Sequence, residues 1–238
     1  MLDEGYAAPK WEFDEFVTQV FDDMLERSIP QYGVMRDSVL AAAMPFQKDN
    51  TDIVDLGCSR GGAIAPFIDQ FGAHNRFWLI DVSGPMLEAA KERFKGYQGT
   101  PSGDIVKIRN MDLRTDYPPV NACITLSILT LQFTPMEYRL QILNNVYKHC
   151  ADGGVFILVE KVLGNSADID QLMVNTYYDF KRANGYTEDQ IQRKRLSLEG
   201  VLVPVTARYN EELLKMAGFK EVDCFFRWMN FCGWMAVK

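Results

Sequence analysis

Apolar residues recur along the chain with two different periods, and the segments they define alternate between helix and strand. From Trp11 to Leu25 the apolar positions repeat at helical spacing, which predicts one amphipathic helix that ends before Pro30. A second helix is predicted over residues 34–44. Beyond it, short apolar runs follow one another, and such runs are typical of parallel strands that are buried on both faces. The alternation predicts an α/β protein.

Five of these apolar runs predict the strands of a mostly parallel sheet, and helical patterns separate them. The strands are expected at residues 53–56, 76–81, 105–110, 122–129 and 153–161, with the fourth beside the first. Helices are expected at residues 63–71, from the N-cap Ser83 to about residue 95, and at residues 136–149 with Pro135 in the first helical position. Residues 96–103 are expected to form a loop.

The last third of the chain adds an insertion and a hairpin to these units. Residues 164–203 carry two helical patterns, and their place after the fifth strand predicts a lid and substrate site over the sheet edge. Residues 219–228 and 230–237 predict an antiparallel hairpin, which completes a sheet of seven strands. The expected organisation is one domain with a helical cap at 1–50, a core at 51–163, a lid at 164–203, and a helix with the hairpin at 204–238.

Composition argues against several classes of protein. The chain has 238 residues, of which 47% are hydrophobic, so it is long enough to bury the core of one α/β domain. Its net charge of −7 argues against a direct grip on nucleic acid, which needs lysine and arginine to neutralise phosphates. No apolar run approaches the roughly 20 residues of a membrane span, and no leader pattern precedes Trp11, so a cytoplasmic protein is expected. The five cysteines lack metal-ligand spacing, so no metal site is expected.

The candidate chemistry begins at the glycine-rich turn after the first strand. Gly57 and Gly61 let the backbone adopt positive φ and let a ligand approach closely, because no Cβ intervenes. Asp81 ends the second strand, where its carboxylate can accept hydrogen bonds from both hydroxyls of a ribose. Asp112 follows the third strand at the ligand-binding edge and can accept a hydrogen bond from an adenine amino group. An adenosine ligand is therefore expected, although a glycine turn by itself is also common as a plain connection.

The turn also narrows the choice of adenosine ligand. A dinucleotide-binding turn has glycine where this chain has Ser59, and a P-loop needs Gly-Lys-Ser/Thr, which is absent. The remaining pattern, Asp55-x-Gly57-Cys58-Ser59-x-Gly61 with Asp81, resembles the first two motifs of the Rossmann-like class I S-adenosyl-L-methionine (SAM) methyltransferase fold. The resemblance implies a mostly parallel seven-stranded sheet with a C-terminal antiparallel hairpin, and SAM or carboxy-SAM as the cofactor.

From about Trp11 to its end the sequence is similar to the carboxy-S-adenosyl-L-methionine synthase family. The similarity is carried by residues 20–24 with 27–32, by 54–59, by Thr130-Leu131-Gln132-Phe133, and by 179–186 with Lys194-Arg195. The run Asp179–Tyr186 is the most specific of these stretches because it is long and unusual. The family resemblance implies a homodimer that moves a carboxyl group from prephenate to the methyl carbon of SAM. The product would feed modification of the tRNA wobble uridine by a partner transferase.

The resemblance also assigns site residues. Arg195 is expected to pair with the new carboxylate, since its planar fork matches a carboxylate, and Tyr32 to line the amino-acid end of the cofactor. These two are the expected catalytic residues. The full set expected to bind the cofactor is Tyr32, Asp55, Gly57, Cys58, Ser59, Asp81, Val82, Asp112, Leu113, Ser127 and Arg195.

Two departures from the family pattern leave other functions open. The family keeps an asparagine just ahead of Thr130, where this chain has Ser127, Ile128 and Leu129. Arg60 stands where the family usually has an apolar residue. A divergent small-molecule SAM-dependent methyltransferase is the first alternative, and a SAM-binding partner protein without turnover is the second.

Overall fold

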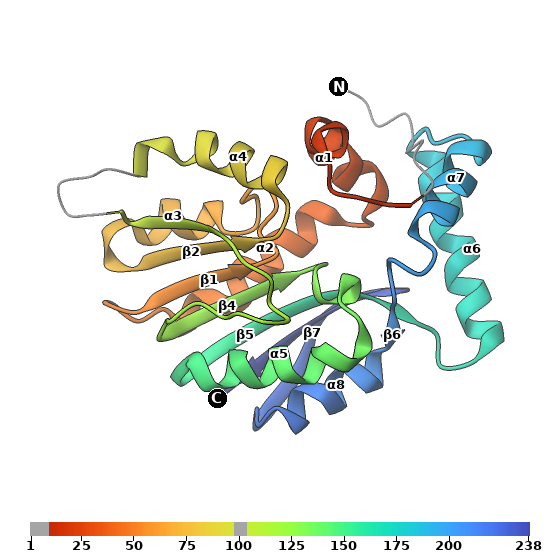
Figure 1. Cartoon of the computed structure of the whole chain (residues 1–238). Coiled ribbons are helices and arrows are strands. Elements are labelled where there is room, and N and C mark those ends of the chain that lie inside the picture. The colour runs from red at the N-terminus through yellow and green to blue at the C-terminus, as the bar shows by residue number, and fades with distance from the viewer. Residues whose placement is uncertain (1–9, 98–103) are drawn as a thin grey trace.

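One twisted sheet with helices on both faces forms the body of the protein (Figure 1). The structure is a computed structural model and describes residues 10–97 and 104–238. The strands run in the order β3-β2-β1-β4-β5-β8-β7, and a short β6 pairs with β5. Their bounds are β1 (Asp52–Leu56), β2 (Arg76–Asp81), β3 (Val106–Asn110), β4 (Ala122–Ile128), β5 (Cys150–Leu163), β6 (Val205–Thr206), β7 (Glu221–Trp228) and β8 (Phe231–Val237). β8 runs antiparallel to β5 and to β7, whereas the pairs among β1 to β5 are parallel.

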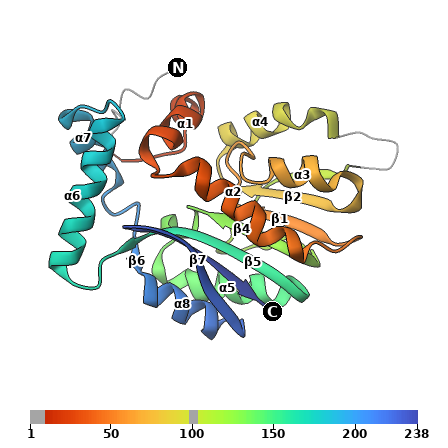
Figure 2. The ribbon, with the colours of Figure 1, turned by 180° about the vertical axis from the view of Figure 1, so that it is seen from behind.

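Two layers of helices cover the sheet because its strands are apolar on both faces. The α-helices are α1 (Glu15–Ser28), α2 (Tyr32–Ala43), α3 (Ala65–Phe71), α4 (Gly84–Arg93), α5 (Met136–His149), α6 (Ala167–Ala183), α7 (Glu188–Leu198) and α8 (Ala207–Met216). Short 3-10 helices follow α2, α3, α4 and β4. They are, in that order, η1 (Met44–Phe46), η2 (Gly72–His74), η3 (Lys95–Tyr97) and η4 (Leu131–Phe133). One core cluster joins the sheet to α2, α3 and α4, and a second joins the opposite face to α5 and α8. Figure 2 shows the same layers from behind.

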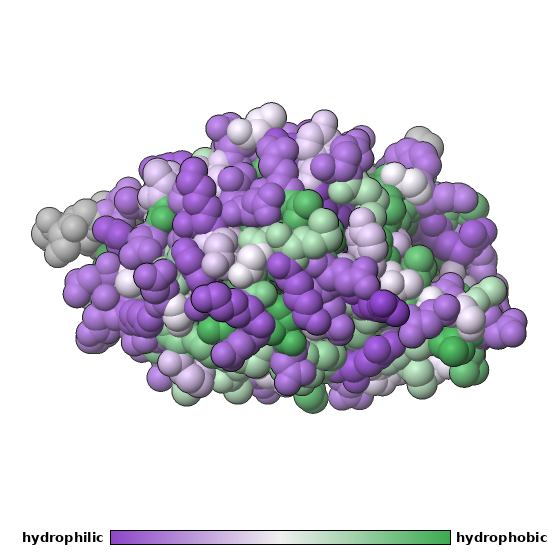
Figure 3. Space-filling model, turned by 90° about the horizontal axis from the view of Figure 1, so that it is seen from below, coloured by the Kyte–Doolittle hydropathy of each residue, from purple (hydrophilic) through white to green (hydrophobic). Residues whose placement is uncertain are grey.

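The outer side of the α5 and α8 layer faces solvent. Along α8, Leu213 and Leu214 are buried, whereas Arg208 and Glu212 are exposed and form an ion pair. Figure 3, seen from below, shows hydrophilic residues over much of this face with smaller hydrophobic areas between them. Within residues 10–97 and 104–238, no helix combines the length and apolar character needed to cross a bilayer.

The main sequence predictions of the fold are confirmed, and the differences have local causes. The parallel core, the hairpin and the two helices of the 164–203 insertion are all present. The first helix starts at Glu15 rather than Trp11, because the Asp14 carboxylate accepts a hydrogen bond from the backbone N–H of Val17 and caps it. Pro135 is the N-cap of α5 and not its first helical residue, since its backbone is extended. β6 was not expected, and most of the loop predicted at 96–103 lies outside the described residues.

The two insertion helices, α6 and α7, are joined to α1, and α6 also packs against the ends of β7 and β8. The Arg27 guanidinium donates to the carbonyl of Asn184 over 2.9 Å, and the Asn184 amide donates back to the carbonyl of Arg27 over 3.1 Å. The Arg27 guanidinium also lies 4.3 Å from the centre of the Tyr186 ring, and the Ser28 hydroxyl bonds to the Tyr186 hydroxyl. Both ribbon views place α1 between α4 and α7. Asn184 and Tyr186, at the end of the Asp179–Tyr186 run, therefore lie at a joint between α1 and the insertion.

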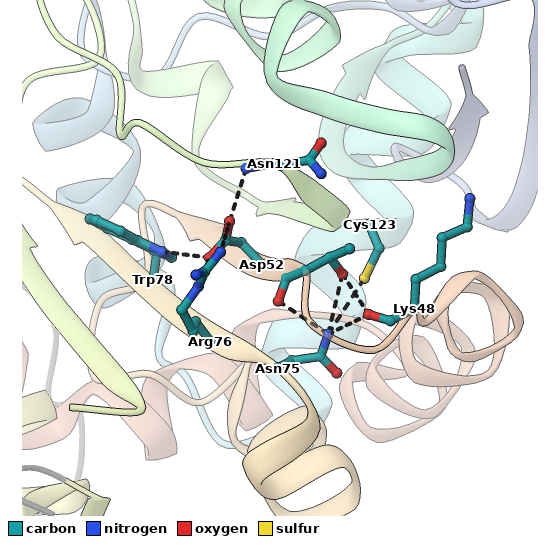
Figure 4. Close-up of polar contacts among 8 residues, drawn as sticks. Lys48, Asp52, Asn75, Arg76, Trp78, Asn121 and Cys123 are labelled. Carbon is teal, nitrogen blue, oxygen red and sulfur yellow. Dashed lines mark hydrogen bonds and ion pairs between the residues drawn. The ribbon is translucent and has the colours of Figure 1, made fainter. Parts of the chain in front are cut away.

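The buried carboxylate of Asp52 in β1 accepts hydrogen bonds from β2 and from the segment before β4 at the amino edge of the sheet. The Asp52 carboxylate accepts from the Arg76 guanidinium at 2.8 and 3.1 Å, from the Trp78 indole N–H at 3.1 Å and from the backbone N–H of Asn121 at 2.9 Å (Figure 4). Next to it, the Asn75 side chain donates to the loop before β1. Every carboxylate oxygen is satisfied, so this cluster fixes how β1, β2 and β4 begin.

Replacing Asp52 by alanine is expected to lower the free energy of unfolding by about 3–5 kcal/mol, because it leaves buried donors without an acceptor. Urea denaturation measures the change. Glu88→Ala is the matched control: it breaks the exposed pair with Lys91 and should cost less than about 1 kcal/mol. Equal effects of the two substitutions would contradict this role for Asp52.

Candidate functional site

A cavity of about 890 Å³ lies at the carboxyl edge of the sheet, within the size range of small-molecule sites. Its floor comes from the segments that follow β1, β2, β3 and β4, and its cover comes from α1, α6 and α7. The order of the strands reverses between β1 and β4, so this is the switch point at which open α/β sheets bind ligands.

The glycine turn after β1 adopts a conformation that other residues would strain. Gly57 has φ of 77°, and a Cβ there would lie 2.1 Å from the Thr130 side chain. Gly61 has φ of 72°, and a Cβ there would lie 2.3 Å from the Phe94 ring. The turn therefore packs closely against η4 and α4 while Gly57 lines the cavity. Cys58 is buried, and burial raises the pKa of its thiol well above the usual value, so it is not a nucleophile.

The Asp81 carboxylate holds this turn against β2 and faces the cavity. One oxygen accepts from the backbone N–H of Ser59 over 2.8 Å, and the other accepts from that of Ser83 over 2.9 Å. Burial is the main cause that raises the pKa of Asp81, and these backbone donors act against it. Each oxygen keeps further acceptor capacity, so the carboxylate can accept from two ribose hydroxyls.

Asp112 lines the same cavity, but Arg114 already engages its carboxylate. The Arg114 side chain donates to the two Asp112 oxygens at 2.9 and 2.6 Å, and its backbone N–H donates at 3.0 Å. The hydrogen bond from Arg114 is the main cause that lowers the pKa of Asp112. The position of Asp112 after β3 predicts an acceptor for adenine but does not reveal this pairing, because nothing in the spacing shows where the Arg114 side chain turns. An adenine amino group can use Asp112 only if Arg114 moves or shares the carboxylate.

Asp55 is buried beside the cavity and does not line it. Side chains alternate along β1, so Asp55 points toward α2 rather than upward into the cavity. Both of its carboxylate oxygens lack a hydrogen-bond partner within the described part of the chain. Burial raises its pKa to about 7, with the charge of Arg36 acting against this shift and that of Asp81 adding to it. An orphaned buried carboxylate next to Gly57 fits a cofactor that carries an ammonium group, as SAM does.

Tyr32 and Arg36 form a polar chain on α2 at the wall of the cavity. The Arg36 guanidinium donates to the Tyr32 hydroxyl over 3.0 Å and also to the carbonyl of Gly62. Arg36 is not among the residues that the sequence predicts for the site, as Tyr32 is, although the spacing of four residues on a helix is a signal that can reveal such a pair. Tyr32 is the first residue of α2, so its side chain projects from the start of that helix.

Arg195 reaches the cavity from α7. Its side chain is exposed and donates to the Gln192 side chain over 3.0 Å. Burial raises the pKa of the neighbouring Tyr178, and the charge of Arg195 lowers it in part, which places the two side chains near each other. Arg195 and Tyr178 therefore bring a cation and a phenol from the insertion to the same cavity as Asp81.

The cavity brings together most of the residues expected to bind the cofactor. Those that line it are Tyr32, Gly57, Cys58, Ser59, Asp81, Val82, Asp112, Leu113 and Arg195. Ser127 does not, because Ile124 and Leu126 point to the α2 to α4 face and the alternation of β4 turns Ser127 to the other face. Ile128 and Leu129 line the cavity in its place. Within the described chain, no group of three His, Cys, Asp or Glu side chains is placed to hold a metal ion.

Two relatives resemble the chain over nearly its whole length. It is 40% identical over 226 residues to the carboxy-S-adenosyl-L-methionine synthase of Methylococcus capsulatus, covering 95% of this chain and 93% of the relative. It is 35% identical to the protein of the same name from Staphylococcus epidermidis, covering 98% of this chain and 100% of the relative. A family model described as a methyltransferase domain matches residues 54–156.

Solved structures of lower identity share the fold. Human N-acetylserotonin methyltransferase in complex with SAM superimposes with a TM-score of 0.59 at 17% identity, covering 94% of this chain and 55% of that chain. Mitomycin 7-O-methyltransferase superimposes with a TM-score of 0.58 at 16% identity, covering 94% of this chain and 60% of that chain. The chain thus spans little more than half the length of these structures. The predicted class I SAM methyltransferase fold is confirmed.

Asp55→Asn is expected to raise the free energy of unfolding and to lower the affinity for SAM. Because the pKa of Asp55 rises from 3.8 to about 7 on folding, ionisation of this carboxyl destabilises the folded protein. The loss of stability is absent below pH 4 and grows as the pH rises to 7. At pH 8 the variant should unfold with a free energy higher by up to about 4 kcal/mol, while its affinity for SAM falls by about tenfold or more.

Urea denaturation at pH 4 and pH 8, with calorimetric titration of SAM, measures both effects. The exposed Asp116→Asn is the control and should change neither. A variant that binds SAM as well as the wild type would show that the Asp55 carboxylate has no part in binding.

Proposed function

The chain belongs to the carboxy-S-adenosyl-L-methionine synthase family and is a SAM-utilising transferase, and on this premise we propose that it makes carboxy-SAM from SAM and prephenate. The observation that carries the proposal is the charge of the cavity. Its described lining residues include seven basic side chains and four acidic ones, although the chain as a whole carries a net charge of −7. A local excess of cations suits a second substrate with two carboxylates.

The proposed reaction balances without a further reagent. Bound SAM supplies a methyl carbon beside a sulfonium, which gives up a proton and takes carbon dioxide. Prephenate supplies that carbon dioxide as it aromatises to phenylpyruvate, and the hydroxide that it loses leaves with the proton as water. The protein therefore has to hold two ligands in contact and to keep bulk water away from them.

Residues of the insertion and of α2 are proposed to hold the two ligands. The Arg195 guanidinium can pair through two parallel N–H donors with the carboxylate that forms on the cofactor. The Tyr32 hydroxyl, which accepts from Arg36, is proposed to contact the amino-acid end of SAM. The insertion helices α6 and α7 cover the cavity and act in this proposal as its lid.

One observation favours plain methyl transfer as a second candidate. Leu129 adopts a positive φ of 59° at the end of β4, and it and Ile128 place apolar side chains where the family keeps an asparagine. An apolar wall there removes a polar contact to the cofactor. In this alternative the chain would methylate a small acid, and Arg195 would bind that acid.

The setting of the enzyme is also part of the proposal. A cytoplasmic homodimer would pass carboxy-SAM to a partner transferase for tRNA wobble-uridine modification, and the net charge of −7 suits an enzyme that does not grip RNA itself. Support for a dimer comes from α6, where Ile169 and Leu172 are exposed apolar residues.

Incubating the pure protein with SAM and prephenate tests the reaction. Mass spectrometry should find a sulfonium product in which one carboxyl group has replaced a methyl hydrogen. A methylated acid and S-adenosylhomocysteine would instead establish the second candidate.

Arg195→Lys is expected to lower kcat/KM for carboxy-SAM formation by about 10–100-fold, because lysine keeps the charge and loses the bidentate fork. The affinity for SAM should change by less than about twofold, since the new carboxylate is absent from SAM. Arg193→Lys is the matched control on the same helix, where Arg193 pairs with Asp189 at the surface. Loss of activity in the control alone would contradict the role given to Arg195.

A further inference from the structure

Lys161 lies near the end of β5 and lines the cavity. Its backbone N–H donates to the side-chain oxygen of Gln132 over 2.7 Å, which fixes the strand end against η4. Lys161 also pairs with Phe231 in the β5 and β8 register. The Nζ atom lies 4.7 Å from the centre of the Tyr177 ring, and Tyr177 and Phe231 pack with their ring centres 5.5 Å apart. Gln132 comes from η4, Tyr177 from α6 and Phe231 from β8, and all three line the cavity. Together with β5, four elements therefore meet around Lys161.

This ammonium group has no acceptor within the described chain. No carboxylate, carbonyl or hydroxyl in residues 10–97 and 104–238 accepts a hydrogen bond from the Nζ atom. The acid that acts on it most is Asp170, whose carboxylate accepts from the backbone N–H of Gly164 over 2.7 Å instead. Burial lowers the pKa of Lys161 to about 8, so the group remains mostly protonated at neutral pH. The ammonium group has three N–H donors, and it lies between the Tyr177 ring and the cavity. It can therefore donate to an anion that enters the cavity.

Several other cations of the cavity already have acceptors in the protein. Arg36 donates to Tyr32 and Gly62, Arg60 pairs with Asp22, and Arg114 pairs with Asp112. Arg195 donates to Gln192, and in the proposed reaction its guanidinium pairs with the new carboxylate. A second substrate with two carboxylates needs a second cation, because one of its carboxylates is transferred and the other stays on the 2-oxo acid.

We propose that Lys161 binds the carboxylate that the second substrate retains, while Arg195 receives the carboxylate that is transferred. The inference rests on the proposed function and adds a binding residue to it. Lys161 and the Tyr177 ring would fix the 2-oxo acid end of the substrate, and the lid would present Arg195 to its other end. The retained carboxylate does not change during the reaction. The point charge of a lysine ammonium is therefore enough to bind it, and the bidentate geometry of a guanidinium is not required.

Lys161→Met tests this assignment, because methionine keeps the length and loses the charge. We expect the KM for prephenate and the dissociation constant of phenylpyruvate, titrated by calorimetry onto the SAM-loaded protein, both to rise about tenfold or more. Phenylpyruvate carries only the retained carboxylate, so its binding reports on the Lys161 subsite and not on Arg195. Lys161→Arg should recover most of both constants, and the affinity for SAM should stay within about twofold.

Lys107→Met is the matched control, since the Lys107 ammonium lies 4.6 Å from the centre of the Trp78 ring and outside the cavity. It should leave both constants unchanged. If Lys161→Met does not fold, Lys161→Gln takes its place, with a thermal melt to show that it is folded.

Two outcomes overturn the assignment. In the first, neither constant changes in the folded Lys161 variant. In the second, only the KM for prephenate rises, which would place Lys161 on the transferred carboxylate. The proposed function fails separately, when the wild-type protein makes no carboxy-SAM, and the phenylpyruvate titration then still decides whether Lys161 binds a carboxylate.

Discussion

The Asp81 carboxylate is the contact on which the geometry of the site depends. It accepts one backbone N–H from the glycine turn after β1 and one from Ser83, the N-cap of α4, so a single side chain aligns two adjacent strand ends. The turn that Asp81 holds forms part of the floor of the cavity beneath α1 and the insertion. The same contact leaves lone pairs that face the cavity, so the group that shapes the site can also bind its ligand.

The joint between α1 and the insertion is the second constraint. Arg27 and Asn184 exchange hydrogen bonds between segments that are 157 residues apart, and the Arg27 guanidinium lies over the Tyr186 ring. The stretch that marks the family most clearly thus does structural work at its end, where it sets the position of α7 and of Arg195. Within this run, Asn184 and Tyr186 have a structural role, because both contact the end of α1.

The sequence was sufficient for most of the fold because strands and helices depend on local periodicity. It also located the cavity, since the acids Asp81 and Asp112 follow strands whose carboxyl ends meet at one edge. It could not show which way single side chains turn. Examples are the Arg114 side chain on Asp112 and the direction of Ser127. The role proposed for Lys161 depends on its lack of an acceptor, which can be recognised only once Tyr177, Gln132 and Asp170 are placed around it.

The account requires that SAM and a dianionic acid meet in one cavity and exchange a carboxyl group there. The most direct measurement uses prephenate labelled with carbon-13 at the ring carboxylate, followed by nuclear magnetic resonance of the sulfonium product in buffer with unlabelled bicarbonate. The account predicts that the label appears in the new carboxyl group at close to the enrichment of the prephenate. A sulfonium without the label, or a label found only as dissolved bicarbonate, would contradict it.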